Sequence, residues 1–363
     1  MKKVLELDIK KQLGSFSLNV QASIGNGITG IYGPSGHGKT SMLNAVAGLI
    51  RPDSGRIFLN DVCVYNADEH IHVPVHKRKI GYVFQDIRLF PHLSVEQNLR
   101  YGLKKFDAVK IGFNQVVEVL QINHLLAKKP SECSGGEKQR ISIGRALLSG
   151  AQILMMDEPF SAVDIHLRNS IIPFLNAINR RFQIPMLIVS HDLPDLLSLT
   201  DHLLLLKNGN ITALGRFQDL IQDENNIGIM KDAGLYNVFN LRVSDSLPAK
   251  NMVLLSNKSN SFQVQVLLQS LLQKVEIGKP IKVLIRPEDI SISRQTVDQI
   301  SLRNQIQGKI IKIFTRKGLS FCLVDAGEKV LVEITEASKQ KMNLDRGTTV
   351  YCLFKSAALK IFE

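Results

Sequence analysis

The chain has 363 residues, of which 44% are hydrophobic, so it is long enough for two or three domains with a sizeable core. It contains no run of about 18 consecutive apolar residues, the length that a membrane-spanning helix requires. The first ten residues alternate apolar and polar positions, so we expect no secretory signal. The cysteines lack paired spacing, which favours reduced thiols in the cytoplasm over a disulfide framework or a zinc site: Cys63, Cys133, Cys322 and Cys352.

The chain is basic, with 45 Lys and Arg against 33 Asp and Glu and a net charge of +12. Such a charge suits a nucleic acid, an anionic membrane surface or an anionic ligand. It also suits an ordinary solvated surface, because the positive residues are spread along the whole chain. Only 6% of residues are aromatic and Trp is absent, so no stacking platform for bases is visible. We expect no nucleic-acid partner.

The chain has two parts that differ in their sequence pattern. Up to about residue 236, short apolar strands alternate with helical segments, which predicts a parallel α/β sheet. Strands are expected at 28–32, 80–84, 153–156 and 186–189, with a helical subdomain over about 86–150. Beyond that point, short apolar runs separated by Gly, Asn and Asp predict an all-β region. We divide it into a linker with a first β half at 237–292 and a small β domain at 293–363.

A phosphate-binding motif follows the first predicted strand of the sheet. The pattern G-x-x-x-x-G-K-[ST] and the next residue are supplied by Gly33, Pro34, Ser35, Gly36, His37, Gly38, Lys39, Thr40 and Ser41. Glycines let backbone N–H groups approach phosphate oxygens, and the N-terminus of the next helix adds partial positive charge. Lys39 can reach the β- and γ-phosphates, and the Thr40 hydroxyl can bind Mg²⁺. His37 occupies a position where only the backbone should matter, so we interpret it as neutral variation.

Two carboxylates follow the strand predicted at 153–156. The carboxyl end of a parallel strand borders the crevice in which ligands bind. Asp157 would therefore hold Mg²⁺ through water, and Glu158 would accept a proton from the attacking water. An Asp-Glu pair alone is more often a helix cap, so the prediction depends on the phosphate loop that precedes it.

The segment Ser134-Gly135-Gly136-Glu137 resembles a motif of the ABC ATPases. In that family the motif opens a helix whose N-terminus contacts the γ-phosphate of ATP held by the other subunit. Cys133 stands where the family usually has Leu, and Glu137 stands where Gln is common. Cys is also a small apolar residue, so the N–H donors of the motif should be preserved.

Three further elements resemble the family in the same order along the chain. Gln85 matches the glutamine that touches Mg²⁺ and senses the transmembrane partner, and residues 161–164, ending at Asp164, match the loop that crosses the dimer interface. His191 matches the histidine that contacts the γ-phosphate. The resemblance implies that Gln85 and His191 act with Glu158 in catalysis. An adenine-stacking aromatic is missing, since Leu13 stands at its place, and Phe16 is a substitute that we do not assign.

The resemblance implies ATP and Mg²⁺ as cofactors and a homodimer that closes head to tail around two ATP molecules. It also implies two transmembrane permease subunits, a periplasmic or extracellular solute-binding protein, and a peripheral position on the cytoplasmic face of the inner membrane. Residues 86–103 are the candidate docking surface for the permease. Ordinary packing of the helical subdomain is the alternative explanation for that segment.

The carboxyl-terminal part resembles the molybdate-binding (Mop) module, a five-stranded OB-like barrel, through residues 301–310, 334–338 and 354–356. The module implies an oxyanion site for molybdate or tungstate, with candidate residues Ser301, Arg303, Lys355 and Ser356, whose donors suit a tetrahedral anion. Residues 286–289 resemble a related β domain (TOBE) of importer ATPases, so about 240–293 would form a degenerate first half. A purely structural β domain is the alternative.

The fold class predicted is therefore an α/β P-loop ATPase with a helical subdomain, followed by an all-β OB-like domain. The predicted function is ATP hydrolysis coupled to molybdate or tungstate import. An importer for sulfate, iron, a polyamine or a sugar is one alternative. Another is a soluble ABC ATPase acting in DNA repair or translation, although those proteins usually carry insertions or a second ATPase. A cytoplasmic molybdate store would leave the phosphate loop without a role.

Overall fold

The computed structural model describes residues 3–103, 111–230, 235–247, 251–270, 276–316 and 318–362. Parts of the predicted helical subdomain (104–110) and of the first β half (248–250 and 271–275) lie outside the described residues. The chain divides into two compact units, Met1–Arg216 and Phe217–Glu363. The boundaries expected at 236/237 and 292/293 stay predictions. In the part that the structure describes, no helix is both long and apolar enough to cross a bilayer.

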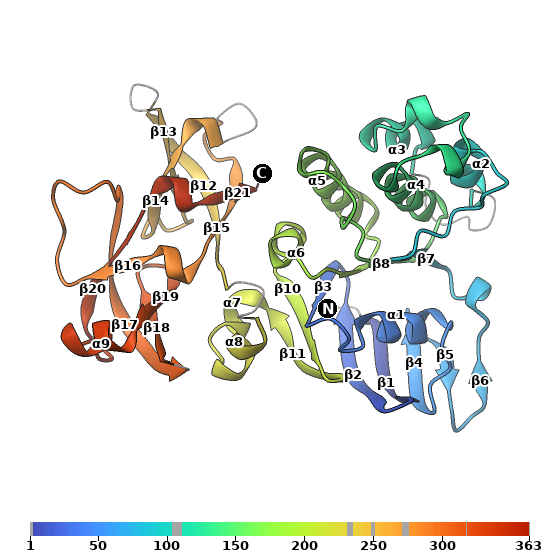
Figure 1. The fold of residues 1–363 in the computed structure, drawn as a ribbon, viewed down its shortest axis with the longest axis horizontal. Coiled ribbons are helices and arrows are strands. Elements are labelled where there is room, and N and C mark those ends of the chain that lie inside the picture. Colours follow the sequence, from blue (N-terminus) through green and yellow to red (C-terminus); the bar gives the residue numbers. More distant parts are fainter. Residues whose placement is uncertain are drawn as a thin grey trace. The chain divides into compact units, whose positions relative to one another are not determined.

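The first unit is built on one 11-stranded sheet, in the order β6-β5-β4-β1-β2-β11-β10-β3-β9-β8-β7 (Figure 1). The strands from β10 to β7 are parallel, whereas those from β6 to β2 are antiparallel. The bounds are β1 (Lys3–Leu13), β2 (Phe16–Gly25), β3 (Ile28–Tyr32), β4 (Ser54–Leu59), β5 (Val62–Asn66), β6 (Ile71–His72), β7 (Ile80–Val83), β8 (Ile153–Asp157), β9 (Met186–Val189), β10 (His202–Lys207) and β11 (Asn210–Arg216).

The three central strands β3, β9 and β8 are buried along their whole length. Parallel strands that are covered on both faces have continuous runs of apolar residues in the sequence. These three strands could therefore be predicted from the sequence. The three are direct neighbours and run in the same direction, so their carboxyl ends meet at one edge of the sheet. That edge therefore gathers the segments that follow each strand.

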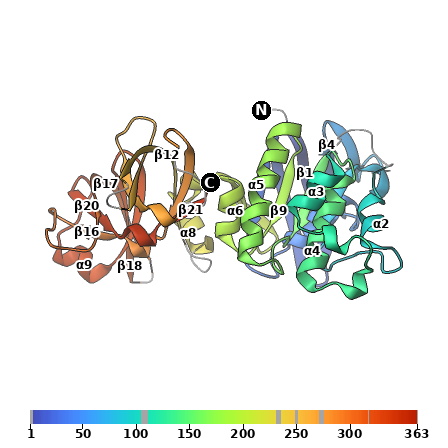
Figure 2. The same ribbon diagram turned by 90° about the horizontal axis from the view of Figure 1, so that it is seen from above.

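Among the described residues of this unit, six helices accompany the sheet: α1 (Lys39–Ala47), α2 (Val95–Arg100), α3 (Phe113–Val119), α4 (Gly135–Leu148), α5 (Ile165–Phe182) and α6 (Leu193–Leu199). Helix α1 buries its apolar side chains in a core shared with the sheet. Helices α2 and α3 each contact α4, and Figures 1 and 2 show the three as one helical group. Ser134 and Glu137 form a capping box that starts α4, each accepting the other's backbone N–H.

The second unit contains two five-stranded sheets, β14-β13-β12-β15-β21 and β16-β20-β17-β18-β19, that share one hydrophobic core. Its elements are α7 (Phe217–Leu220), α8 (Glu224–Met230), β12 (Asn237–Leu247), β13 (Met252–Ser256), β14 (Gln263–Leu267), β15 (Pro280–Ile285), β16 (Ser291–Ser293), β17 (Asn304–Arg316), β18 (Leu319–Asp325), β19 (Lys329–Thr335), α9 (Glu336–Lys341), β20 (Thr349–Phe354) and β21 (Lys360–Phe362).

The two sheets of the second unit are related as an internal repeat. Asn237 opens β12, and its side chain accepts from Leu331 N at 2.6 Å and donates to Leu331 O at 2.8 Å. Asn304 opens β17 and does the same with Gln265, at 2.7 Å and 3.1 Å. Each repeat thus uses a buried asparagine at its start to hold the third strand of the other repeat. Strand β16 follows the first repeat in the chain but pairs with β20 of the second repeat. Strand β21 follows the second repeat but pairs with β15 of the first.

We expect Asn237→Ala to lower the free energy of unfolding of the second unit by about 2 kcal/mol, because it leaves the buried N–H and C=O of Leu331 without partners. Urea-induced unfolding followed by circular dichroism measures the effect. Gln307→Ala removes an exposed amide from β17 and is the matched control. Equal stability of the two variants would contradict the role of Asn237.

Candidate functional site

A cavity of about 290 Å³ lies at the edge where the central strands end. It brings together residues that the sequence placed in one site although they are far apart in the chain. From the predicted phosphate loop it is lined by Ser35, Gly36, Gly38, Lys39, Thr40 and Ser41, and from other segments by Phe16, Gln85, Asp157, Glu158 and Val189. Of the two residues considered for the adenine, Phe16 lines this cavity.

Two glycines of the loop are required by its backbone. Gly38 has φ +98°, a left-handed conformation that favours glycine, and it is the residue from which α1 begins. At Gly33, a Cβ would lie 2.1 Å from the carbonyl oxygen of Leu206 on the neighbouring strand β10. The loop therefore turns tightly at one end and packs against backbone at the other.

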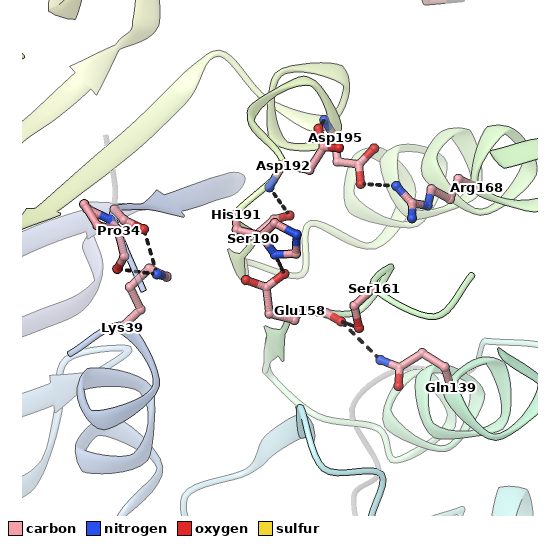
Figure 3. A network of polar contacts seen from close by, with 11 residues as sticks. Pro34, Lys39, Gln139, Glu158, Ser161, Arg168, Ser190, His191, Asp192 and Asp195 are labelled. Carbon is pink, nitrogen blue, oxygen red and sulfur yellow. Dashed lines mark hydrogen bonds and ion pairs between the residues drawn. The ribbon is translucent and has the colours of Figure 1, made fainter. Parts of the chain in front are cut away.

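Lys39 points its ammonium group back along the loop. Its Nζ donates to Gly33 O at 2.7 Å and to Pro34 O at 2.9 Å (Figure 3). Burial lowers the pKa of Lys39, and the nearby carboxylates Glu158 and Asp157 oppose that shift. The site thus contains one buried cation facing two buried anions.

Asp157 is 1% exposed, and its Oδ1 has no hydrogen-bond partner. Burial raises the pKa of Asp157, opposed by a hydrogen bond from the Thr40 side chain and by the charge of Lys39. The free carboxylate oxygen of Asp157, the Thr40 hydroxyl and the Gln85 amide belong to residues that line the same cavity. Together they offer a set of hard oxygen ligands. These residues therefore fit Mg²⁺, which prefers carboxylates and oxygen donors.

Glu158 has φ +51°, which is uncommon for a residue with a side chain and marks local strain. Its Oε2 lies 2.8 Å from Nδ1 of His191, and its carbonyl accepts from the Ser161 hydroxyl at 3.0 Å and from Gln139 Nε2 at 3.4 Å (Figure 3). Burial raises the pKa of Glu158, opposed chiefly by His191. A carboxylate held in this way is suited to accept a proton inside the cavity.

Other predicted residues do not line this cavity. Ser134, Gly135, Gly136 and Glu137 form the start of α4, and Asp164 caps α5 by accepting from Leu167 N at 3.0 Å. Their donors therefore lie at helix N-termini, where anions bind readily. A Cβ on Gly136 would lie 2.6 Å from Ala162 O, so the start of α4 packs closely on the loop before α5.

His37 has a structural contact that the sequence interpretation missed. Its Nδ1 accepts a hydrogen bond from Asn208 N at 2.9 Å, and its carbonyl accepts from Gly209 N at 3.2 Å. The histidine thus ties the phosphate loop to the turn between β10 and β11. Only the Asn-Gly pair, a turn signal, hinted at this neighbour in the sequence.

The four candidate oxyanion residues lie at one end of the β17–β20 ladder. Asn304 pairs with Phe354, which brings Ser301 and Arg303 to the same end as Lys355 and Ser356. Lys355 is exposed and Arg303 lies beside Asn304 at the start of β17, whereas Ser356 is buried and its Oγ accepts from Asn304 Nδ2 at 3.4 Å.

The first repeat has different residues at the matching positions, because Asn237 corresponds to Asn304. Tyr236 takes the position of Arg303, and Arg286 and Pro287 follow β15 as Lys355 and Ser356 follow β20. Arg286 is already engaged, donating to Tyr236 Oη at 3.3 Å and to Glu288 at 3.0 Å. The two ends therefore differ in the side chains that they offer to an anion.

Comparisons with known proteins agree with this geometry. Residues 16–161 match the model of the ABC transporter family. The chain is 36% identical to the molybdenum import ATP-binding protein ModC of Mannheimia succiniciproducens, over 98% of this chain and 99% of that protein. It is also 36% identical to the ModC of Haemophilus influenzae, over 98% and 100%.

Among solved structures, a dimeric ATP-binding cassette in a post-hydrolysis state bound to ADP and Pi matches with a TM-score of 0.51 at 25% identity, covering 58% of this chain and 98% of that one. A nucleotide-free ATP-binding cassette from an ABC transporter matches with a TM-score of 0.52 at 26% identity, covering 62% and 98%. Fold and sequence agree: this chain belongs to the family of ABC transporter ATP-binding proteins that includes the molybdenum import ATP-binding proteins.

Proposed function

We propose that this chain hydrolyses ATP as a homodimer and couples hydrolysis to the import of molybdate or tungstate. The observation that carries the proposal is the convergence of Lys39, Asp157 and Glu158 with the glycine loop in one cavity. Full-length similarity to molybdenum import ATP-binding proteins supports the cargo. The partners would be two permease subunits and a solute-binding protein, with this chain peripheral on the cytoplasmic face of the inner membrane.

In this proposal the loop amides and Lys39 bind the phosphates of ATP. Thr40, Asp157 and Gln85 would hold Mg²⁺, which when bound supplies neutralisation of the phosphate charge. Lys39 would exchange its contacts with the Gly33 and Pro34 carbonyls for contacts with phosphate oxygens. The buried position favours these charge–charge contacts, because they act in a region with little water.

Glu158 would accept the proton of the attacking water, with His191 holding its carboxylate in place. The segment from Ser134 to Glu137 of a second copy would supply N–H donors to the γ-phosphate. That role accounts for a helix start that lies outside the cavity of the single chain. Closure of the dimer then completes the site, and release follows hydrolysis.

The surface proposed for permease docking, residues 86–103, carries partly exposed apolar side chains. Tyr101 is 49% exposed and its ring lies 4.4 Å from that of Phe90, centroid to centroid. Arg145 of α4 covers Phe90, 5.2 Å from the ring centroid. An aromatic pair in which one ring is about half exposed is suited to receive a partner.

We expect Glu158→Gln to lower the turnover of ATP by about 10²-fold or more, since it removes the proton acceptor while keeping the side chain's shape. ATP should then accumulate on a dimer that size-exclusion chromatography with light scattering can detect. Glu118→Gln, an exposed change on α3, is the matched control. Normal turnover in Glu158→Gln would remove this assignment.

We expect tungstate or molybdate to raise the melting temperature of the full-length chain, and Arg303→Ala with Lys355→Ala to reduce that shift. Both cations lie at the end of the ladder that carries the Ser356 hydroxyl, and charged donors of this kind suit a tetrahedral oxyanion. Differential scanning calorimetry provides the measurement.

Arg286→Ala, at the matching position of the first repeat, is the control and should leave the oxyanion-induced shift intact. Stabilisation by sulfate or by a polyamine in place of tungstate would indicate an importer for another solute. Co-purification with nucleic acid instead of two membrane subunits would favour a soluble ABC ATPase.

A further inference from the structure

Two loops of the candidate site are linked by one side chain that sequence reasoning did not single out. Arg168 lies in the first turns of α5, and its backbone N donates to Asp164 O at 3.0 Å. Its Nε donates to Val163 O at 2.9 Å, in the loop that follows Glu158. Its Nη1 donates to Asp195 Oδ2 at 2.9 Å, in the first turn of α6 (Figure 3).

Asp195 in turn is connected to the segment that carries His191. Its backbone N donates to Asp192 Oδ1 at 3.2 Å, which caps the start of α6. The backbone N of Asp192 donates to the Ser190 hydroxyl at 3.0 Å. The orientation of the His191 segment is therefore fixed by the same helix start to which Arg168 is bonded.

These contacts form a closed circuit that includes Glu158, the proposed proton acceptor. Glu158 bonds His191 on one side, and on the other its carbonyl accepts from Ser161, in the loop that Arg168 holds through Val163. Starting from Glu158, the contacts run to His191, then along the chain to the start of α6 and to Asp195. From Asp195 they continue through Arg168 back to the loop that contains Ser161 and Val163. A guanidinium can bond both partners at once because its N–H groups lie in one plane.

The pair is enclosed, with the Arg168 side chain 20% exposed and that of Asp195 11% exposed. A surface ion pair contributes little to stability, but a mostly buried one that also holds a backbone carbonyl restricts two segments together. Asp192 and His191 are the other charged or titratable groups that act on Asp195.

We propose that Arg168 and Asp195 act as positioning residues that couple residues 161–164 to His191, so that a movement of residues 161–164 changes the position of His191. This inference rests on the proposed ATPase function. Residues 161–164 would meet the second copy, so the link would report dimer closure to the histidine that holds Glu158. Neither side chain lines the cavity, and both act through their neighbours.

Two conservative changes in the full-length chain test the link, with Mg²⁺-ATP hydrolysis as the assay. Arg168→Lys keeps the charge but cannot offer two N–H groups in one plane, and Asp195→Asn keeps the shape but removes the charge. We expect each to lower kcat about tenfold with little change in KM, because alignment and not binding is lost. The double variant should be no worse than either single one, since both break the same link.

The pH profile separates positioning from a purely structural role. Burial, with the charge of Asp192 adding to it, raises the pKa of Asp195 to about 6. The Asp195 carboxylate is ionised above that pH and loses its charge as the pH falls through it, whereas the amide introduced by Asp195→Asn is neutral throughout. The ratio of wild-type to variant kcat should therefore fall toward one as the pH is lowered through the pKa of Asp195, while effects of Glu158 cancel in the ratio.

Arg180→Gln, which removes an exposed arginine from the last turn of α5, is the control and should hydrolyse ATP normally. Thermal melting of each variant shows whether folding is intact. Wild-type turnover in Arg168→Lys or Asp195→Asn, additive losses in the double variant, or a ratio that does not change with pH would each overturn the inference. A wild-type chain without Mg²⁺-ATP hydrolysis would instead count against the proposed function itself.

Discussion

Three charged side chains are buried together at one edge of an apolar sheet, and the rest of the site is arranged around that constraint. Lys39, Asp157 and Glu158 are all buried, at 8%, 1% and 9% exposed. Buried charges are costly unless they are paired and hydrogen-bonded. Lys39 donates hydrogen bonds to two loop carbonyls, and the Glu158 carboxylate is paired with His191. One oxygen of the Asp157 carboxylate, in contrast, has no hydrogen-bond partner. The free Asp157 oxygen is suited to a cation and the Lys39 ammonium to an anion, which is why we propose that a metal ion and a phosphate would bind here together.

The strands and loops of this part of the molecule could be predicted because their signals are local. The strand–loop–helix around Lys39 and the carboxylates after β8 are each encoded within about ten residues, and neighbouring parallel strands place their ends at one edge. Contacts that depend on which strands are neighbours were not predictable. The bond from Asn208 to His37 requires β10 to lie beside β3, and the pair Arg168–Asp195 requires α5 and α6 to start side by side.

In the second unit, the sequence predicted that the first half would be a degenerate copy of the second. The asparagines that open β12 and β17 agree with that relation, since each holds the third strand of the other repeat. The exchange of β16 and β21 could not be seen in the sequence, because both strands are only three residues long. As a result the two halves share one core, so a ligand bound at the end of β17 and β20 would act on a body that includes both repeats.

The loops after β8 and β9 are built in the same way, and this similarity explains how they can be coupled. Each strand is followed within two residues by one member of the Glu158–His191 pair, and each loop then ends in an aspartate that caps the next helix, Asp164 or Asp192. A capped helix start and a buried strand end fix the loop at both sides, which leaves few residues free to move. Any displacement would therefore be confined to those residues and to the side chains that bridge them. In the proposed coupling, the Arg168 guanidinium between the two helix starts would then be enough to make the loops move together.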